Sequence, residues 1–344
     1  MADLRRNSIL FFLMAIGLLL LFVANVSLGS IKIPFAEVIK PLTGGYASRN
    51  TWDYIIINYR LPKALVALLA GMALAVSGLL MQTLFRNPLA GPDVLGLSSG
   101  ASLGVALVIL GSGLLPLSIA SYFLSGYGLV LASIIGTFGV LLLVLAVAQR
   151  LRDTMAILIT GIMFGSFTGA IVGVLSFFTT AERLQKYTYW ALGSLGNLPW
   201  ESVSLLAVIT LAGIAMGIAC IKPLDALLMG ERYAASMGIN IKRSRLLIIL
   251  ATSLLTGCVT AFAGPISFVG LIVPHIARLL FRAGSHRVLF FATLLTGGML
   301  MLVCDILTQL PGTEAVLPIN GITAMIGAPI VIGLLLKNKR GAFR

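Results

Sequence analysis

The sequence carries very little charge for its length. Only 10% of its 344 residues are charged, and its mean hydropathy is +1.06, whereas about 25% of the residues in a soluble globular domain are charged. Apolar stretches of about 20 residues recur along the whole chain, as expected for a protein that lies in a lipid bilayer. The sequence therefore predicts an all-α membrane protein with many spans, and its continuous apolar runs exclude a transmembrane β-barrel.

Cysteine and histidine are scarce. The three cysteines, Cys220, Cys258 and Cys304, lie in separate apolar segments, which excludes a disulfide framework or a cysteine metal cluster. The two histidines, His275 and His286, do not suffice for a transition-metal site built by the protein. We therefore expect buried, unreactive cysteines and no bound metal.

The chain also lacks the motifs of several enzyme classes. It contains no Gly-x-x-x-x-Gly-Lys-Ser/Thr phosphate-binding loop, with which it could hydrolyse ATP. No nucleophile stands beside an obvious base, and a lone helical histidine such as His275 is more often packed than catalytic. The net charge of +13 comes without a folded basic domain that could bind nucleic acid. Neither an enzyme nor a nucleic-acid-binding protein is expected.

Segments without Asp, Glu, Lys or Arg define the expected spans. Two of them are too long for one crossing and divide at proline, one near Leu114-Leu115-Pro116 and the other at Gly264-Pro265, because proline interrupts a helix. The first apolar run, Ile9 to Val26, exceeds the length typical of a signal peptide, so we interpret it as an uncleaved span. A single transmembrane domain over residues 1–344 is expected, with ten spans at about 7–31, 64–85, 94–112, 118–147, 154–181, 202–221, 246–264, 266–282, 288–304 and 315–336.

The loop charges predict the orientation. With ten spans both termini lie on one side, and 17 of the 24 lysines and arginines fall on that side. Because basic loops stay in the cytoplasm, both termini are expected there. The external side holds seven basic residues, Lys32, Lys40, Arg49, Arg60, Lys63, Arg183 and Lys186.

A faint internal repeat surrounds two Gly-Pro pairs. The segment Ala90-Gly91-Pro92 with Val94-Leu95-Gly96-Leu97 recurs as Ala263-Gly264-Pro265 with Phe268-Val269-Gly270-Leu271. Five spans separate the copies, so the repeat would be inverted in the membrane. Inverted repeats with interrupted helices are typical of transporters, although glycine and alanine are common enough here for a chance match.

Four glycines of the fifth expected span are spaced by four residues, at Gly161, Gly165, Gly169 and Gly173. This spacing places them on one helix face. The face either packs closely against another helix or forms a smooth wall past which a solute moves, and both interpretations remain open.

The cytoplasmic loop 222–245 between the sixth and seventh spans predicts two short helices. We expect a hinge at Gly230 and a stop at Gly238, a common residue after a helix C-terminus. The segment is more apolar than a solvated loop requires, with Leu224, Leu228 and Met237 among its residues. It therefore lies in the membrane interface or fills a groove on a cytoplasmic partner.

Two features remain on the external half. Arg60-Leu61-Pro62-Lys63 follows the large outer loop 29–59 and is interpreted either as anchoring basic residues or as a docking point for an acidic partner. Asp305 is identified as the only acidic residue at membrane depth. A proton relay would need more than one such group, so we favour a structural hydrogen bond to a buried partner.

Several of these segments together resemble the FecCD-type ABC permeases, which import ferric siderophores, haem or cobalamin. The resemblance runs from about residue 55 to the C-terminus. It rests on Arg60-Leu61-Pro62-Lys63, Gln82 with Asn87-Pro88-Leu89-Ala90-Gly91-Pro92, Leu228-Met229-Gly230-Glu231 with Ser236-Met237-Gly238, Gly264-Pro265-Ile266-Ser267-Phe268-Val269-Gly270-Leu271-Ile272-Val273-Pro274-His275, and Leu317-Pro318-Ile319 with Gly327-Ala328-Pro329.

The resemblance implies a ten-helix permease of a bacterial inner membrane and its partners. These are a second permease, expected to be a second copy of this chain, two cytoplasmic ATPases and an external substrate-binding protein. No cofactor is expected on this chain, because ATP and Mg²⁺ would bind the partner ATPases. Residues 224–240 match the coupling helices that contact those ATPases, which favours the partner groove; the matching residues are Leu224, Leu228, Gly230, Glu231, Ala234, Met237 and Gly238.

The resemblance also implies roles for other residues. Arg60 and Lys63 match basic residues that dock the binding protein, whereas Gln309 stands where some members have a further arginine. A short external helix is expected over about Glu182–Leu192. The translocation path and its cytoplasmic gate match Asn87, Leu89, Thr154, Met155, Gly161, Gly165, Gly169 and Gly173.

His275 belongs to the family motif whatever the cargo, so it is no sign of haem. The sequence thus predicts an ATP-driven importer of a bulky metal chelate. Its alternatives are an ion-gradient-driven carrier that uses Asp305 and a protein that transports nothing.

Overall fold

The computed structural model describes residues 2–29, 31–114, 124, 126–150, 154–281, 285–309 and 316–341. Within these residues the structure is helical and contains one isolated β-bridge, between Gln309 and Val316. The elements are α1 (Ala2–Ser27), α2 (Phe35–Leu42), α3 (Asn50–Ile55), η1 (Ile56–Arg60), α4 (Leu61–Leu84), η2 (Pro92–Leu95), α5 (Leu97–Ile109), η3 (Gly111–Leu114), α7 (Gly126–Arg150), α8 (Thr154–Phe178), α9 (Ala181–Ala191), α10 (Trp200–Ala219), α11 (Ile221–Met229), α12 (Glu231–Ser236), α13 (Ile241–Ala263), α14 (Val269–Phe281), α15 (His286–Thr308) and α16 (Ile319–Gly341).

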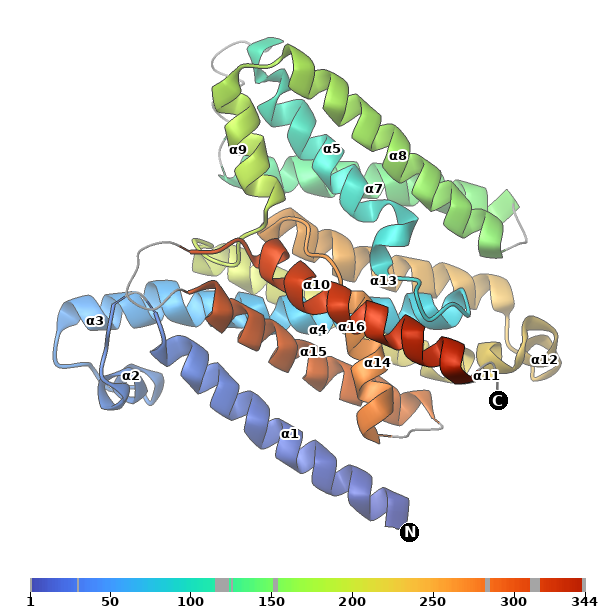
Figure 1. The fold of residues 1–344 in the computed structure, drawn as a ribbon, viewed down its shortest axis with the longest axis horizontal. Helices are drawn as coiled ribbons and strands as arrows, with labels where there is room; N and C mark the ends of the chain where they lie inside the picture. The colour runs from blue at the N-terminus through green and yellow to red at the C-terminus, as the bar shows by residue number, and fades with distance from the viewer. Residues whose placement is uncertain are drawn as a thin grey trace.

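Each of the ten expected spans contains an apolar helix. In the described part of the chain, seven helices are long and apolar enough to cross a membrane, and three apolar segments are shorter, at Leu97–Gly113, Val269–Phe281 and Ile319–Gly333. Both termini lie at the end of the helix bundle that carries α11 and α12, and α2 and α3 lie towards the other end (Figure 1). This arrangement agrees with an even number of crossings.

One expected boundary was wrong. The second span begins at Asn50 rather than near residue 64, because α3, the π-helical turn η1 and α4 form one continuous helix of 35 residues. In the fourth span the structure describes α7 from Gly126, and the predicted start at residue 118 lies outside the described residues. Leu115 and Pro116 of the predicted division lie outside the described residues, and α5 ends before them at Ile109.

The helices form two groups. Helices α5, α7, α8 and α9 lie together beside a larger group that contains α1, α4, α10 and α13 to α16 (Figure 1). Helix α4 is the centre of the larger group, with most of its side chains buried, and it packs closely against α14 and α15 through the glycine pairs Gly78 with Gly270 and Gly71 with Gly297. A side chain at any of these glycines would collide with the facing backbone, so glycine sets how near the helices come.

Both Gly-Pro pairs interrupt the chain as expected. Gly264 has φ +77° and ends α13, after which residues 265–268 are unwound and α14 follows. Gly91-Pro92 likewise precedes the short turn η2 and then α5, and α5 and α14 each contain 13 residues. The unwound backbone around Gly264 is bonded to neighbouring segments: the Ser267 N–H donates to Asn320 Oδ1 at 3.0 Å, and the Ala263 carbonyl accepts from the Ser194 N–H at 2.9 Å. Unwound backbone is stable at membrane depth only under such conditions.

Candidate functional site

The loop 222–245 folds as two short helices, as the sequence predicted. Helix α11 ends at Gly230, whose φ of +120° and ψ of 149° admit only glycine without strain, and α12 follows directly. The chain turns again at Gly238, with φ +81°. The hinge and the stop therefore both depend on backbone conformations that other residues rarely adopt.

This helix pair has one face packed on the bundle and one face exposed. The side chains of Leu224 and Ala234 are fully buried, and Glu231 pairs with Arg245 of α13 at 2.9 Å. The exposed face consists of large apolar residues, Leu228, Met229, Tyr233 and Met237, which are 52% to 73% exposed. Of the residues predicted for coupling, Leu224, Glu231 and Ala234 contact the bundle, whereas Leu228 and Met237 are exposed. We call the four exposed apolar residues the coupling surface.

The loop between α4 and η2 lies beside the coupling helices. Arg86 has φ +46° and donates from Nε to the Leu227 carbonyl of α11 at 3.0 Å. Within the loop, the Asn87 side chain accepts a bond from the Leu89 N–H at 2.9 Å, and the Leu89 side chain is 38% exposed. We call residues 86–91 the gate loop, because the family resemblance implies a gate at Asn87 and Leu89.

His275 fixes the gate loop to α14. Its Nε2 lies 2.9 Å from the carbonyl oxygen of Pro88, a contact in which the ring nitrogen donates. A second link lies nearby, where Gln82 of α4 donates to the Leu271 carbonyl and accepts from Arg278 Nη1, at 2.9 and 2.8 Å. The histidine is therefore a structural contact of the gate loop.

The predicted glycine face of α8 has two different halves. Gly161 is buried against the backbone of Gly96, and a β-carbon on Gly165 would lie 3.3 Å from Ser99 Oγ. Gly169 and Gly173 face open space. The first half of the glycine face is therefore a helix-packing surface, and the path along the second half stays a prediction. Thr154 and Met155 begin this helix, and their side chains lie outside the described residues.

A polar cavity of about 320 Å³ adjoins the open half of α8. It is lined mainly by Asp93, Ser98, Ser99, Ser102, Thr168, Gly169, Tyr187 and Ser267. Asp93 accepts a bond from the Ser98 hydroxyl at 2.6 Å, and burial raises the pKa of Tyr187 on α9, so its phenol stays neutral. The sequence analysis did not single out Asp93, although this residue directly follows the Gly91-Pro92 break.

Asp305 is buried between three spans. The Lys63 ammonium group lies 3.0 Å from its Oδ1, and the Asn25 amide donates to its Oδ2 at 2.9 Å. The carboxyl group is 1% exposed and the lysine side chain 17%. The structure thus contains the buried partner that the sequence analysis favoured for Asp305.

The Arg60 side chain is buried. It is 8% exposed and donates to the carbonyl oxygens of Val26 and Ser27, at 3.1 and 2.7 Å, and to that of Ile31. The carbonyls at the end of α1 carry partial negative charge and attract the guanidinium group. Arg60 thus bonds the second span to the end of α1, and the docking of a partner at this basic step stays a prediction.

Arg60 and Lys63 both line a cavity of about 560 Å³. Asp305, Gln309 and residues 192–197 also line it. The expected short external helix is present as α9, and the chain returns from it along this cavity. In the described residues, no group of three histidine, cysteine or acidic side chains could hold a metal ion.

The fold and these sites define a helical membrane permease. Residues 17–337 match the FecCD transport family. The chain belongs to this family, and its function is that of a membrane permease in an ABC importer.

Curated relatives extend over most of the chain. The vitamin B12 import system permease protein BtuC of Salmonella typhi is 38% identical over 290 residues, which are 84% of this chain and 85% of that protein. The hemin transport system permease protein HmuU of Yersinia pestis is 32% identical over 326 residues, which are 94% and 96% of the two chains.

Two solved structures are similar. A metal-chelate type ABC transporter in an inward-facing conformation is 29% identical, with a TM-score of 0.82, and the match covers 95% of this chain and 99% of that one. PsaBC from Streptococcus pneumoniae in complex with Fab is 17% identical, with a TM-score of 0.54 over 87% and 94% of the two chains, and supports the fold alone.

Proposed function

We propose that this permease moves a bulky metal chelate into the cytoplasm, using ATP hydrolysed by a partner subunit. The observation that supports this most is the coupling surface, since four large apolar side chains on a rigid cytoplasmic helix pair suit a groove on another protein. ATP and Mg²⁺ would bind that partner. A ferric siderophore, haem or cobalamin is the expected cargo, a class supported by the relatives that import vitamin B12 and hemin.

The proposed assembly has two permeases, two ATPases and an external binding protein. The exposed apolar face of α8, with Phe167, Val174 and Phe177, suits a second copy of this chain, and the open glycine half beside it would border the path. The termini and the coupling helices would lie in the cytoplasm. The binding protein would dock over the external cavity, where its acidic groups would meet Arg60 and Lys63.

The alternative of a proton-coupled carrier has little support. Its coupling carboxylate, Asp305, has both oxygens engaged, by Lys63 and Asn25. A group that must bind and release protons in each cycle needs a path to water, and this carboxyl is 1% exposed. The pairing favours a structural role.

Purification from the native membrane tests the proposal. The tagged chain is extracted gently, and its co-purifying subunits are identified and counted. We expect two ATPases for every two permeases and ATP hydrolysis by the complex. A chain that is isolated repeatedly without an ATPase and that moves solute along an ion gradient would contradict it.

A further inference from the structure

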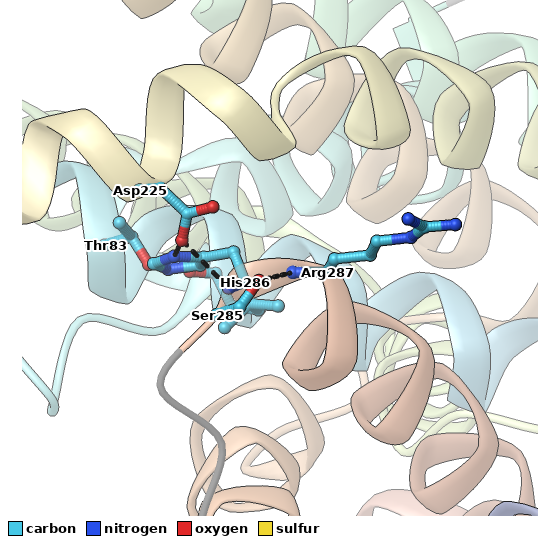
Figure 2. A network of polar contacts seen from close by, with 6 residues as sticks. Thr83, Asp225, Ser285, His286 and Arg287 are labelled. Carbon is cyan, nitrogen blue, oxygen red and sulfur yellow. Dashed lines mark hydrogen bonds and ion pairs between the residues drawn. The ribbon is translucent and has the colours of Figure 1, made fainter. Parts of the chain in front are cut away.

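A buried histidine joins the first coupling helix to two spans. His286, the first residue of α15, is 3% exposed, and its Nδ1 lies 2.8 Å from Oδ1 of Asp225 on α11. The same carboxylate oxygen accepts the His286 backbone N–H at 2.9 Å. On the opposite edge of the ring, Nε2 lies 3.1 Å from the hydroxyl of Thr83, near the end of α4. Figure 2 shows the imidazole between these two partners.

These contacts hold in either protonation state of the ring. Thr83 Oγ1 also lies 3.0 Å from the Leu79 carbonyl. In the neutral ring, Nδ1–H donates to Asp225 and the threonine hydroxyl donates to Nε2. In the charged ring, Nε2–H donates to the threonine oxygen, whose proton turns to Leu79. Both ring nitrogens remain hydrogen-bonded, so the ring connects Asp225 to Thr83 whether it is neutral or charged.

The link leads directly to the gate loop. Thr83 is three residues before Arg86, which holds the Leu227 carbonyl of α11. Helix α11 thus bonds Arg86 of the gate loop directly through Leu227, and it reaches Thr83 at the end of α4 through Asp225 and His286. The gate loop begins at this end of α4 and is fixed at Pro88 by His275.

We infer that His286 is a positioning residue for coupling, which transmits displacement of α11 to the cytoplasmic end of α4 and so to the gate loop. This inference rests on the proposed function, since it requires an ATPase that moves α11. Because coupling is demonstrated by a change of conformation that both sites affect, the test measures movement of the gate loop as well as stability.

The experiment uses the complete complex, purified with its ATPases, and needs no cargo. A Leu89→Cys substitution places a thiol on the gate loop, and the native cysteines are buried, so maleimide labelling reports the gate. We expect ATP to change the labelling rate in this background. Thr83→Val, which removes only the hydroxyl, and Asp225→Ala should each reduce that change at least about fivefold, within the usual range of coupling energies, while ATP hydrolysis continues.

Three further variants separate positioning from folding. Asp225→Asn keeps an oxygen acceptor for the ring and should restore most of the response. The double variant Thr83→Val with Asp225→Ala should lose no more than the more severe single variant, because both act through one ring. Ser285→Ala, which removes the serine cap on the Arg287 N–H, should leave the response intact although it alters the same helix end.

Each result decides between the alternatives. A full gate response in Thr83→Val and Asp225→Ala overturns the inference, as does an actively hydrolysing parent complex whose gate labelling ignores ATP. The inference is also overturned if Thr83→Val and Asp225→Ala lose ATP hydrolysis and the gate response to the same extent and Asp225→Asn recovers neither. If Asp225→Ala does not assemble, Thr83→Val decides. Absence of any ATPase from the purified complex contradicts the proposed function instead.

Discussion

The ammonium group of Lys63 lies 3.0 Å from Oδ1 of Asp305, and the pair joins α4 to α15. Asn25 of α1 completes the site by donating to Oδ2. A charge without a partner is very unfavourable in a bilayer, so each charge of the pair lowers the free-energy cost of burying the other. Together with Asn25, the pair fixes the positions of α1, α4 and α15 relative to one another.

Removing one charge of this pair should destabilise the protein more than removing both. Asp305→Asn leaves the lysine unpaired, and Lys63→Met leaves the carboxylate unpaired, each at a cost of about 3–5 kcal/mol. The double variant Lys63→Met with Asp305→Asn should recover much of this loss. Thermal unfolding of the purified protein in detergent measures all three. Additive losses in the double variant would show that the two groups do not stabilise each other.

The hinge at Gly230 should be intolerant of proline. Proline fixes φ near −65°, whereas this residue has φ +120°. We expect Gly230→Pro to leave the spans folded and to abolish transport, with ATP hydrolysis no longer coupled to uptake. Gly139→Ala is the matched control, since its added β-carbon meets open space. Normal uptake by Gly230→Pro would contradict the coupling role of this loop.

The coupling surface should be necessary for binding the ATPase and dispensable for folding. Met229→Glu places a charge at a side chain that is 73% exposed, so the isolated chain should unfold at an unchanged temperature. The central apolar residues of an interface each contribute about 2 kcal/mol or more, so ATPase recovery on affinity purification should fall at least about tenfold. Tyr46→Glu, on the external loop and 85% exposed, should change neither. Full ATPase recovery with Met229→Glu would exclude this surface.

Much of the fold could be predicted because its signals are local. Charge-free runs identified ten spans, and glycine identified the turns at Gly230, Gly238 and Gly264. The burial of Arg60 and the joint at His286 could not be predicted, because their partners lie far away in the sequence: Thr83 is 203 residues from His286, and Val26 is 34 residues from Arg60. Nothing in the sequence near a polar residue states which distant helix will reach it.

The glycine face of α8 allows its two halves to be tested separately. Gly161 packs against Gly96, so Gly161→Leu overfills a close helix contact and should destabilise the fold by about 1–3 kcal/mol. Gly169 faces open space beside the polar cavity, so Gly169→Leu should leave the unfolding temperature unchanged and reduce uptake by narrowing the path. Thermal unfolding and vesicle uptake, measured on both variants, should show opposite patterns. Unfolding at a lower temperature in both would make the whole face a packing surface, and undiminished uptake with Gly169→Leu would place the path elsewhere.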